Sequence, residues 1–402
     1  MTDRLRIFDT TLRDGEQAPG FSMRADQKLR LAHAIDALGV DVLEAGFPIA
    51  SEDDAEAVRR IAKAIERPVV AALARCRPGD IDRAAWALEP ARRPRLHLFI
   101  ATSDLHLSRK LHLSRAQCLD AAVDSVRRAR VHTDDIEFSA EDATRSDRAF
   151  LYRVIEAVID AGATTINLPD TVGYATPDDI ADFFRDVLGH VANADRACFS
   201  AHCHDDLGLA VANTIAAVGA GARQVECTIN GIGERAGNAS LEEIVMISRV
   251  RPDRVPVETS INATRLYAAS QLLTELTNEP VQANKAIVGR NAFAHEAGIH
   301  QDGILKDRRT YEIMRPADVG APSTLLVLGK HSGRHAVHAR CRDLGYTLSA
   351  DEGDVIYRRL MAIAERKKII TNDDLLSLVH EAREDHRALE AVAHDAGYGF
   401  GV

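Results

Sequence analysis

The chain has 402 residues, of which 46% are hydrophobic and 27% charged, and its formal net charge is −10 at pH 7. Because no long basic block interrupts this acidic balance, we expect no nucleic-acid partner. No apolar run reaches the roughly 18 residues of a membrane span. The N-terminus "MTDRLRIF" lacks the apolar segment of a secretory signal, and the six cysteines form no C-x-x-C pair. These features predict a cytoplasmic protein with reduced thiols and no membrane contact.

Short apolar runs alternate with amphipathic stretches through the first two thirds of the chain. The runs expected to form strands are 5–10, 40–47, 69–75, 95–102, 135–141, 164–170, 197–204 and 224–230. Their near-continuous Val, Ile, Leu and Phe content is typical of parallel strands buried on both faces. Eight βα units in about 250 residues predict an α/β fold, a TIM (β/α)8 barrel. An open doubly wound sheet is the alternative, but it favours a Gly-rich turn after the first strand, where "DTTLRDGEQ" has one glycine.

The intervening stretches have helical patterns. Those with the clearest amphipathic spacing are 24–38, 114–132, 147–161, 177–189 and 208–220. Ser22, Thr176 followed by Pro177, and Ser240 stand where helix starts are expected.

The βα alternation stops after the eighth predicted unit. We therefore expect a catalytic barrel over 1–275, a linker subdomain over 276–330 that carries a loop with His300, and a small helical subdomain over 331–402. The fold prediction is thus a barrel followed by a smaller, mainly helical C-terminal region.

Polar side chains stand at or near the carboxyl end of each predicted strand. In a (β/α)8 barrel the chemistry takes place at this end, and stability alone does not require such convergence. The residues are Arg13, Asp14, Glu44, Arg75, His97, Thr102, Ser139, Glu141, Asp170, Thr171, His202, His204, Asp205, Asp206, Asn230, Glu234, Arg235 and Asn238. Their convergence predicts an active site.

The segment "AHCHDD" predicts a metal site. On a strand, residues i and i+2 point the same way, about 6–7 Å apart, so His202 and His204 can face one ion. Asp14 is the obvious third ligand, and Asn238 could add an oxygen. Two imidazoles with a carboxylate suit Mg, Mn or Zn, whereas iron in a facial triad is the competing interpretation.

The charged residues of the predicted rim have two interpretations each. Arg13 could polarise a carbonyl oxygen, or it could form an ion pair that braces the barrel mouth. Glu141 and Glu234 could act as acid or base if they are buried near the metal, but solvated salt bridges are the ordinary alternative. Glu44 and Arg75 could be no more than an ion pair at the rim.

A polar cluster in "HEAGIHQDG" lies beyond the predicted barrel. His300 alone would be unremarkable, but its neighbours His295, Glu296, Gln301 and Asp302 favour a functional loop.

Four motifs together resemble one family. "DTTLRDGEQ", "HCHDDLGLAVANT", "NGIGERAGN" and "GIHQDGILK" are similar to segments of the metal-dependent acyl-CoA Claisen condensing enzymes, in the same order over residues 4 to 395. This family includes the 2-isopropylmalate, homocitrate and citramalate synthases. The resemblance implies a divalent metal ion held by Asp14, His202, His204 and Asn238.

The resemblance also implies how the 2-oxo acid is held. Arg13 matches an arginine that contacts its keto oxygen, Thr171 matches a threonine that binds its carboxylate, and Glu141 matches an acidic residue beside it. His97 and Ser139 would shape the pocket for its side chain.

The second substrate implied by the resemblance is acetyl-CoA. Glu234 and His300 match the pair associated with its deprotonation, and Tyr311 matches a tyrosine of the same site. In the family the segment with His300 reaches the barrel of a partner subunit, so a homodimer with an exchanged C-terminal segment is implied.

Among the members of this family, "RLHLFIATS", "FSAEDATRSD" and "INLPDTVGYATP" look most like 2-isopropylmalate synthases. The expected reaction is a Claisen condensation of acetyl-CoA with 3-methyl-2-oxobutanoate. Homocitrate or citramalate synthase is the alternative; 2-oxoglutarate would need a cation for its distal carboxylate, and "HLFIATSD" has no arginine. A metal-dependent lyase or aldolase on the same barrel and a non-catalytic scaffold are further alternatives. The full-length synthases carry a leucine-binding C-terminal domain, and we expect this chain to lack inhibition by leucine through such a domain.

Overall fold

The computed structural model describes residues 3–322, 325–326, 328–367 and 370–395. The chain divides into two compact units. The first comprises 1–282 with the short segments 286–288 and 319–321, and the second comprises 283–285, 289–318 and 322–402. The three-part division expected from the sequence stays a prediction.

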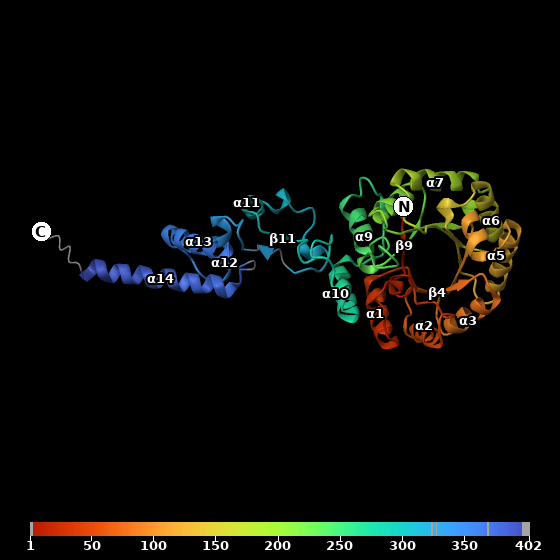
Figure 1. Ribbon diagram of the computed structural model, residues 1–402, viewed down its shortest axis with the longest axis horizontal. Coiled ribbons are helices and arrows are strands. Elements are labelled where there is room, and N and C mark those ends of the chain that lie inside the picture. The colour runs from red at the N-terminus through yellow and green to blue at the C-terminus, as the bar shows by residue number, and fades with distance from the viewer. Residues whose placement is uncertain (1–2, 323–324, 327, 368–369, 396–402) are drawn as a thin grey trace. The chain divides into compact units, whose positions relative to one another are not determined.

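A closed barrel of eight parallel strands forms the centre of the first unit (Figure 1). In order around the barrel, the strands are β2 (Arg6–Asp9), β3 (Val42–Glu44), β4 (Val69–Arg75), β5 (Pro94–Ala101), β6 (Ile136–Glu141), β7 (Thr165–Asp170), β8 (Cys198–Cys203) and β9 (Gln224–Cys227). The predicted (β/α)8 barrel is therefore confirmed.

Helices follow each strand and surround the barrel (Figure 1). They are α1 (Ala25–Leu38), α2 (Glu52–Ala64), α3 (Pro78–Leu88), α5 (Arg115–Ala129), α6 (Arg148–Ala161), α7 (Pro177–His190), α8 (Ala210–Gly219), α9 (Leu241–Val250) and α10 (Leu266–Thr277). A short helix α4 (Asp104–His106) and a π-helical turn η2 (Leu107–Leu111) lie between β5 and α5.

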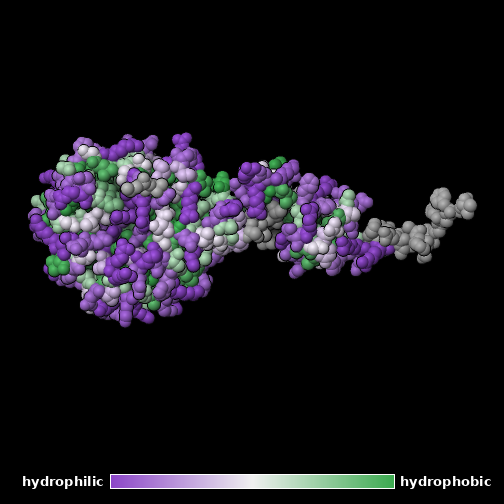
Figure 2. Space-filling view, turned by 180° about the vertical axis from the view of Figure 1, so that it is seen from behind, coloured by the Kyte–Doolittle hydropathy of each residue, from purple (hydrophilic) through white to green (hydrophobic). Residues whose placement is uncertain are grey.

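The helices face the strands because their apolar residues recur with a helical period. In α6, Phe150, Leu151, Val154, Ile155 and Val158 are all buried. The outer face of the molecule seen in Figure 2 is mostly hydrophilic, with smaller hydrophobic patches, as expected for amphipathic helices packed on a barrel.

Two of the three predicted helix starts agree with the structure. The side chain of Thr176 accepts a hydrogen bond from the Asp179 amide at the start of α7, and Ser240 is the N-cap of α9. The prediction for Ser22 is wrong, because α1 begins at Ala25 with Arg24 as its N-cap. There the side chain of Gln27 accepts a hydrogen bond from the Arg24 amide at 2.9 Å, which satisfies a terminal N–H without a capping serine.

The second unit is mainly helical. Its helices are α11 (Gly298–Lys306), α12 (Arg334–Asp343), α13 (Ala350–Ala364) and α14 (Asn372–Asp395), and α13 packs against α14. Its own core contains Val337, Ile356, Leu360, Leu375 and Val379.

Short strand pairs join distant segments within each unit. In the first unit β1 (Asp3–Arg4) pairs with β10 (Val257–Glu258), and in the second β11 (Ala294–His295) pairs with β12 (Leu325–Leu326). Within the described ranges, no helix combines the length and apolar character needed to cross a membrane.

Candidate active site

A cavity of about 640 Å³ lies at the carboxyl ends of the barrel strands. Ten residues predicted for the rim line it, although they come from six different strands or the turns that follow them. They are Arg13, Asp14, His97, Ser139, Glu141, Thr171, His202, His204, Glu234 and Arg235. Asn238 joins them through a hydrogen bond from its Nδ2 to Asp14 Oδ1 at 2.9 Å. The structure thus brings together many of the barrel residues that the sequence predicted, whereas Arg75 and Asp170 do not line the cavity.

The sequence suggested that the first barrel strand ends at Arg13 and Asp14, but the strand ends earlier. β2 ends at Asp9, and the two residues lie in the turn before the 3-10 helix η1 (Gly15–Gln17). The Thr10 hydroxyl accepts a hydrogen bond from the Asp14 amide at 3.2 Å, which ties this turn to the end of the strand.

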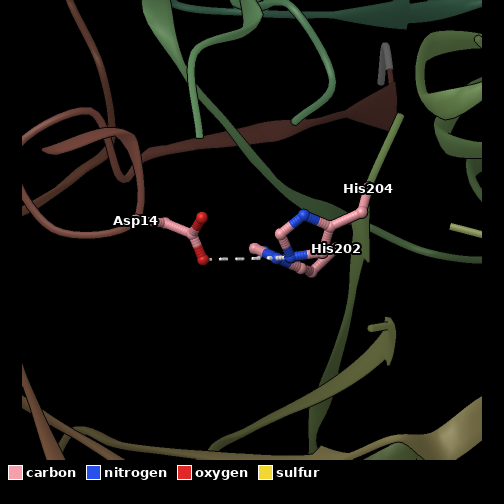
Figure 3. Close-up of side chains that lie close together, drawn as sticks. All are labelled: Asp14, His202 and His204. Carbon is pink, nitrogen blue, oxygen red and sulfur yellow. Dashed lines mark hydrogen bonds and ion pairs between the residues drawn. The ribbon is translucent and has the colours of Figure 1, made fainter. Parts of the chain in front are cut away.

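Asp14, His202 and His204 form a compact set of possible metal ligands (Figure 3). One ligand atom from each lies within 4.8 Å of the others, and all three residues are buried. His202 Nε2 is 3.1 Å from His204 Nε2 and 3.7 Å from Asp14 Oδ2. His202 and His204 are two residues apart at the end of β8, so the pleat turns both rings the same way.

This set fits a divalent cation. A separation of 3.1 Å between the two Nε2 atoms is what two nitrogens show when each lies about 2.1 Å from one ion in adjacent positions. Asn238 adds a second indication, because its Oδ1 is buried without a hydrogen-bond partner among the described residues. Such an oxygen is costly to bury unless a cation or a donor satisfies it.

The charges of the ligand set suit metal binding at neutral pH. Burial opposes ionisation of Asp14, but Arg13, His202 and His204 outweigh it and hold the pKa of that carboxyl well below its usual range. For His204, burial and the neighbouring His202 lower the pKa to about 4, which leaves the imidazole neutral with a free lone pair.

Arg13 is held in place by carboxylates. Its Nε donates to Glu44 Oε2 at 2.6 Å, its Nη1 donates to Asp14 Oδ2 at 2.7 Å, and its Nη2 lies 3.7 Å from Glu226 Oε2. Burial opposes the charge of Glu44, but Arg13 and His97 lower its pKa to about 2. The side chain of Arg13 is 10% exposed, so this charge is nearly dehydrated at the cavity.

The suggested ion pair between Glu44 and Arg75 is wrong. Arg75 donates from Nε to Asp80 Oδ2 at 2.6 Å, outside the cavity lining. Glu44 is fully buried and accepts a hydrogen bond from Arg13 instead. The two residues can meet because the Glu44 strand, β3, lies beside β2 in the barrel.

His97 and Ser139 are parts of one hydrogen-bond chain. His97 Nδ1 lies 2.7 Å from Glu44 Oε1, and His97 Nε2 lies 2.7 Å from Ser139 Oγ. Asn167 Nδ2 donates to the same Ser139 hydroxyl at 2.8 Å. Both nitrogens of His97 are therefore already engaged by the protein.

Glu141 and Thr171 also line the cavity. Glu141 Oε1 accepts a hydrogen bond from Lys110 Nζ at 2.5 Å and is 3.4 Å from His106 Nδ1. The Thr171 hydroxyl accepts a hydrogen bond from the Asp142 amide at 2.9 Å, so its own hydrogen remains free to donate.

His300 and Tyr311 belong to the second unit, where their ring centroids are 4.4 Å apart. His300 lies in helix α11 rather than in the predicted loop, and both side chains are exposed. Their predicted roles toward acetyl-CoA stay predictions.

Several lining residues were not predicted. They are Gln17, Phe47, Leu73, Phe99, Lys110, Asn167, Pro169 and Glu226. For Glu226 a signal existed, since a charged residue in the short apolar run "QVEC" must find a partner inside the barrel.

A second cavity, of about 870 Å³, is lined by residues at the opposite ends of the strands, including Arg4, Arg6, Arg95 and Arg223. Carboxylates neutralise much of its charge; Arg95, for example, donates to Asp135 Oδ1 at 2.8 Å. None of the predicted site residues lines it. This end of a (β/α)8 barrel ordinarily serves stability.

Comparisons with known proteins agree with this geometry. Residues 4–273 match the family model described as HMGL-like, and residues 287–368 match the model described as homocitrate synthase post-HMGL domain-like. A 2-isopropylmalate synthase of Rhodopseudomonas palustris (strain BisB5) is 56% identical over 379 residues, which are 94% of this chain and 72% of that protein. The chain belongs to the 2-isopropylmalate synthase family. This confirms the predicted family and an enzyme of the transferase class.

Another 2-isopropylmalate synthase, of Aquifex aeolicus (strain VF5), is 53% identical over 396 residues, or 98% of this chain and 76% of that protein. Among solved structures, the hydroxymethylglutaryl-CoA lyase of Pseudomonas aeruginosa has a TM-score of 0.61 at 20% identity. The match covers 71% of this chain and 97% of the lyase. At that identity the likeness concerns the fold alone. The lyases and this chain share the barrel fold, so the fold does not distinguish between the two families. The family assignment therefore rests on the sequence identity to 2-isopropylmalate synthases.

Proposed function

We propose that this chain is an acyltransferase that converts the acyl group into an alkyl group on transfer. It would join acetyl-CoA to 3-methyl-2-oxobutanoate, with water, to give 2-isopropylmalate and CoA. The observation that carries the proposal is that Arg13, Asp14, His202 and His204 line one cavity, with Arg13 hydrogen-bonded to Asp14. A cation and a metal site side by side suit a ketone that gains negative charge.

Asp14, His202, His204 and Asn238 would hold a divalent ion, Mg, Mn or Zn. When bound, such an ion acts as a Lewis acid that polarises a carbonyl oxygen and orients the 2-oxo acid.

Arg13 and Thr171 would bind the 2-oxo acid itself. Nη2 of Arg13 is free of short hydrogen bonds and could donate to the keto oxygen as charge develops there. The Thr171 hydroxyl, which already accepts a hydrogen bond from Asp142, would donate to the substrate carboxylate. Glu141 would lie beside the substrate and keep Lys110 in place.

Glu234 and His300, with Tyr311, are proposed to remove a methyl proton from acetyl-CoA, following the family resemblance. The enolate then attacks the keto carbon, and water cleaves the thioester. General-base catalysis of this kind contributes about 100- to 10,000-fold to a rate.

The cavity walls favour an apolar substrate side chain. Phe47, Leu73, Phe99 and Pro169 all line it. The polar atoms of His97 and Ser139 already have hydrogen-bond partners within the protein. These two residues would therefore shape the pocket rather than bind a polar group of the substrate. One observation favours homocitrate synthase as a second candidate, because Lys110 lines the cavity and could meet a distal carboxylate. Glu141 neutralises that charge at 2.5 Å, so we rank this candidate second.

The deciding experiment is a thiol-release assay with acetyl-CoA and a panel of 2-oxo acids, each with and without added divalent metal. We expect 3-methyl-2-oxobutanoate to give the highest kcat/KM, and metal removal to stop turnover. Turnover with 2-oxoglutarate and none with 3-methyl-2-oxobutanoate would show that the substrate assignment is wrong.

We further propose a homodimer in which His300 of one subunit serves the barrel of the other. His202→Ala and His300→Ala variants should each be inactive alone. When they are unfolded and refolded together, heterodimers should contain one intact site, and part of the activity should return. No recovery in a mixture shown to contain heterodimers would contradict the exchange.

A further inference from the structure

Glu226 is a buried carboxylate on β9 that contacts one proposed metal ligand, His202. Its exposure is 1%, and it is the register partner of His202 on the neighbouring strand β8. Register partners on adjacent parallel strands face the same side of a sheet, so the two side chains meet inside the barrel. Glu226 Oε2 lies 2.8 Å from His202 Nδ1.

This contact fixes the tautomer of His202. A carboxylate only accepts hydrogen bonds, so the imidazole proton must sit on Nδ1. The lone pair of a neutral ring is then on Nε2, the atom that faces His204 at 3.1 Å and Asp14 at 3.7 Å. A ligand histidine ordinarily depends on such a partner for its orientation and basicity.

Among the two candidate histidine ligands, only His202 has an anchor of this kind. His204 Nδ1 is buried and has no hydrogen-bond partner among the described residues. Glu44, another fully buried carboxylate of the barrel, already has Thr10, Arg13 and His97 as hydrogen-bond partners. The remaining oxygen of Glu226, Oε1, is 3.9 Å from His97 Nε2, which is too long for a hydrogen bond.

Glu226 lies close to both His202 and Arg13. Oε2, which receives the His202 proton, lies 3.7 Å from Arg13 Nη2, and Arg13 Nη1 donates to Asp14. The same oxygen therefore accepts a hydrogen bond from His202 and attracts the charge of Arg13 at a longer distance.

We propose that Glu226 is a positioning residue that orients His202 for binding a divalent metal ion. The inference rests on the proposed function, because it concerns the metal of that same site. Loss of such an outer partner ordinarily weakens metal binding about 10- to 100-fold.

The test measures Mn²⁺ binding to the metal-stripped full chain by calorimetry, in wild type, Glu226→Gln and Glu226→Ala. The Gln oxygen can still accept from Nδ1 but carries no charge, so we expect a Kd increase of about 10-fold, and about 100-fold for Ala. Thermal unfolding and near-ultraviolet circular dichroism show whether each variant is folded.

Asp80→Asn is the matched control. Asp80 is also a buried carboxylate, but it accepts hydrogen bonds from Arg75 outside the cavity lining rather than from His202. We expect the Kd for Mn²⁺ to be unchanged. An equal weakening in Asp80→Asn would mean that the loss of any buried carboxylate has this effect, and the inference would be overturned.

Wild-type Mn²⁺ affinity in folded Glu226→Gln would also overturn the inference; this variant decides the matter if Glu226→Ala fails to fold. His202→Ala tests the proposed metal site itself, independently of Glu226. If His202→Ala binds Mn²⁺ as tightly as wild type, the proposed metal site itself is wrong. If only His202→Ala loses the metal, the site stands and Glu226 has no positioning role.

Discussion

Arg13 donates from Nε to Glu44 Oε2 at 2.6 Å, inside a barrel where Glu44 has no exposure to water. This pair fixes the guanidinium plane and leaves Nη2 directed toward the carboxylate of Glu226 at 3.7 Å. A buried arginine held in this way differs from a mobile surface cation, because its donors are already oriented before a substrate arrives.

Arg13→Lys should therefore lower kcat by about 100- to 1,000-fold while Mn²⁺ binding changes little. Lysine keeps the charge but cannot donate at once to Glu44, to Asp14 and to a substrate oxygen. Steady-state thiol release gives kcat, and calorimetry gives the metal affinity. Arg128→Lys is the control, since Arg128 also donates from Nε, to Asp82 at 2.8 Å, but on the exposed surface. Near-wild-type kcat in Arg13→Lys would argue against a role at the keto oxygen.

His202→Ala should abolish both metal retention and turnover. The variant removes one ligand and the ring that contacts Glu226, so the remaining groups cannot hold the ion in the same geometry. Metal content after dialysis and thiol release are the two measurements. His190→Ala, on the exposed end of α7, should retain both. Full activity of a metal-free His202→Ala protein would rule out metal dependence.

Leu73→Ala should relax the substrate selectivity. Leu73 lines the cavity, and removing its branched end should lower kcat/KM for 3-methyl-2-oxobutanoate about 10-fold or more. Activity toward the longer 4-methyl-2-oxopentanoate should rise relative to it. Leu98→Ala is the control, because Leu98 is fully buried on β5 but does not line the cavity. It should cost about 2–5 kcal/mol of stability and leave the selectivity ratio unchanged. The same ratio in wild type and Leu73→Ala would place the substrate side chain elsewhere.

Because of Asp9, the free energy of unfolding should fall as the pH rises from acidic to neutral. Burial, with the negative charges of Glu44 and Glu242, raises the pKa of Asp9 to about 7, although hydrogen bonds from Thr11 oppose the shift. The folded state therefore binds a proton that the unfolded chain releases near pH 4. Between these pH values the folded state holds more protons, so the free energy of unfolding falls as pH rises toward 7.

Asp9→Asn removes this titration. Urea unfolding at pH 5 and pH 8 should show a smaller drop in the free energy of unfolding for the variant than for wild type, by on the order of a few kcal/mol. The comparison between variants cancels the contributions of other groups. An identical pH dependence in both proteins would mean that Asp9 keeps an ordinary pKa when folded.

Some of the site could be predicted because its pattern is local. His202 and His204 are two residues apart on a strand, and the alternation of side chains alone makes them face one way. Asp14 and Asn238 could be added because the carboxyl ends of all strands in a barrel meet at one rim. Neither step requires a knowledge of which side chains touch.

Other parts depended on contacts that no local pattern reveals. The pairing of Glu44 with Arg13 rather than Arg75 follows from the neighbourhood of β2 and β3 and from the turn after β2. The partner of Glu226 follows from the register of β8 on β9, in which one residue of slip would turn the carboxylate to the other face.

The amino-acid sequence alone determined the eightfold alternation and the barrel, and it predicted the candidate ligand set, because hydrophobic period and residue spacing act over a few residues. Only the tertiary structure decided which carboxylate holds Arg13 and which orients His202, since these pairs join residues 31 and 24 positions apart through strand register and burial. In the dehydrated interior each charge must find a partner, and strand register fixes which partner is within reach.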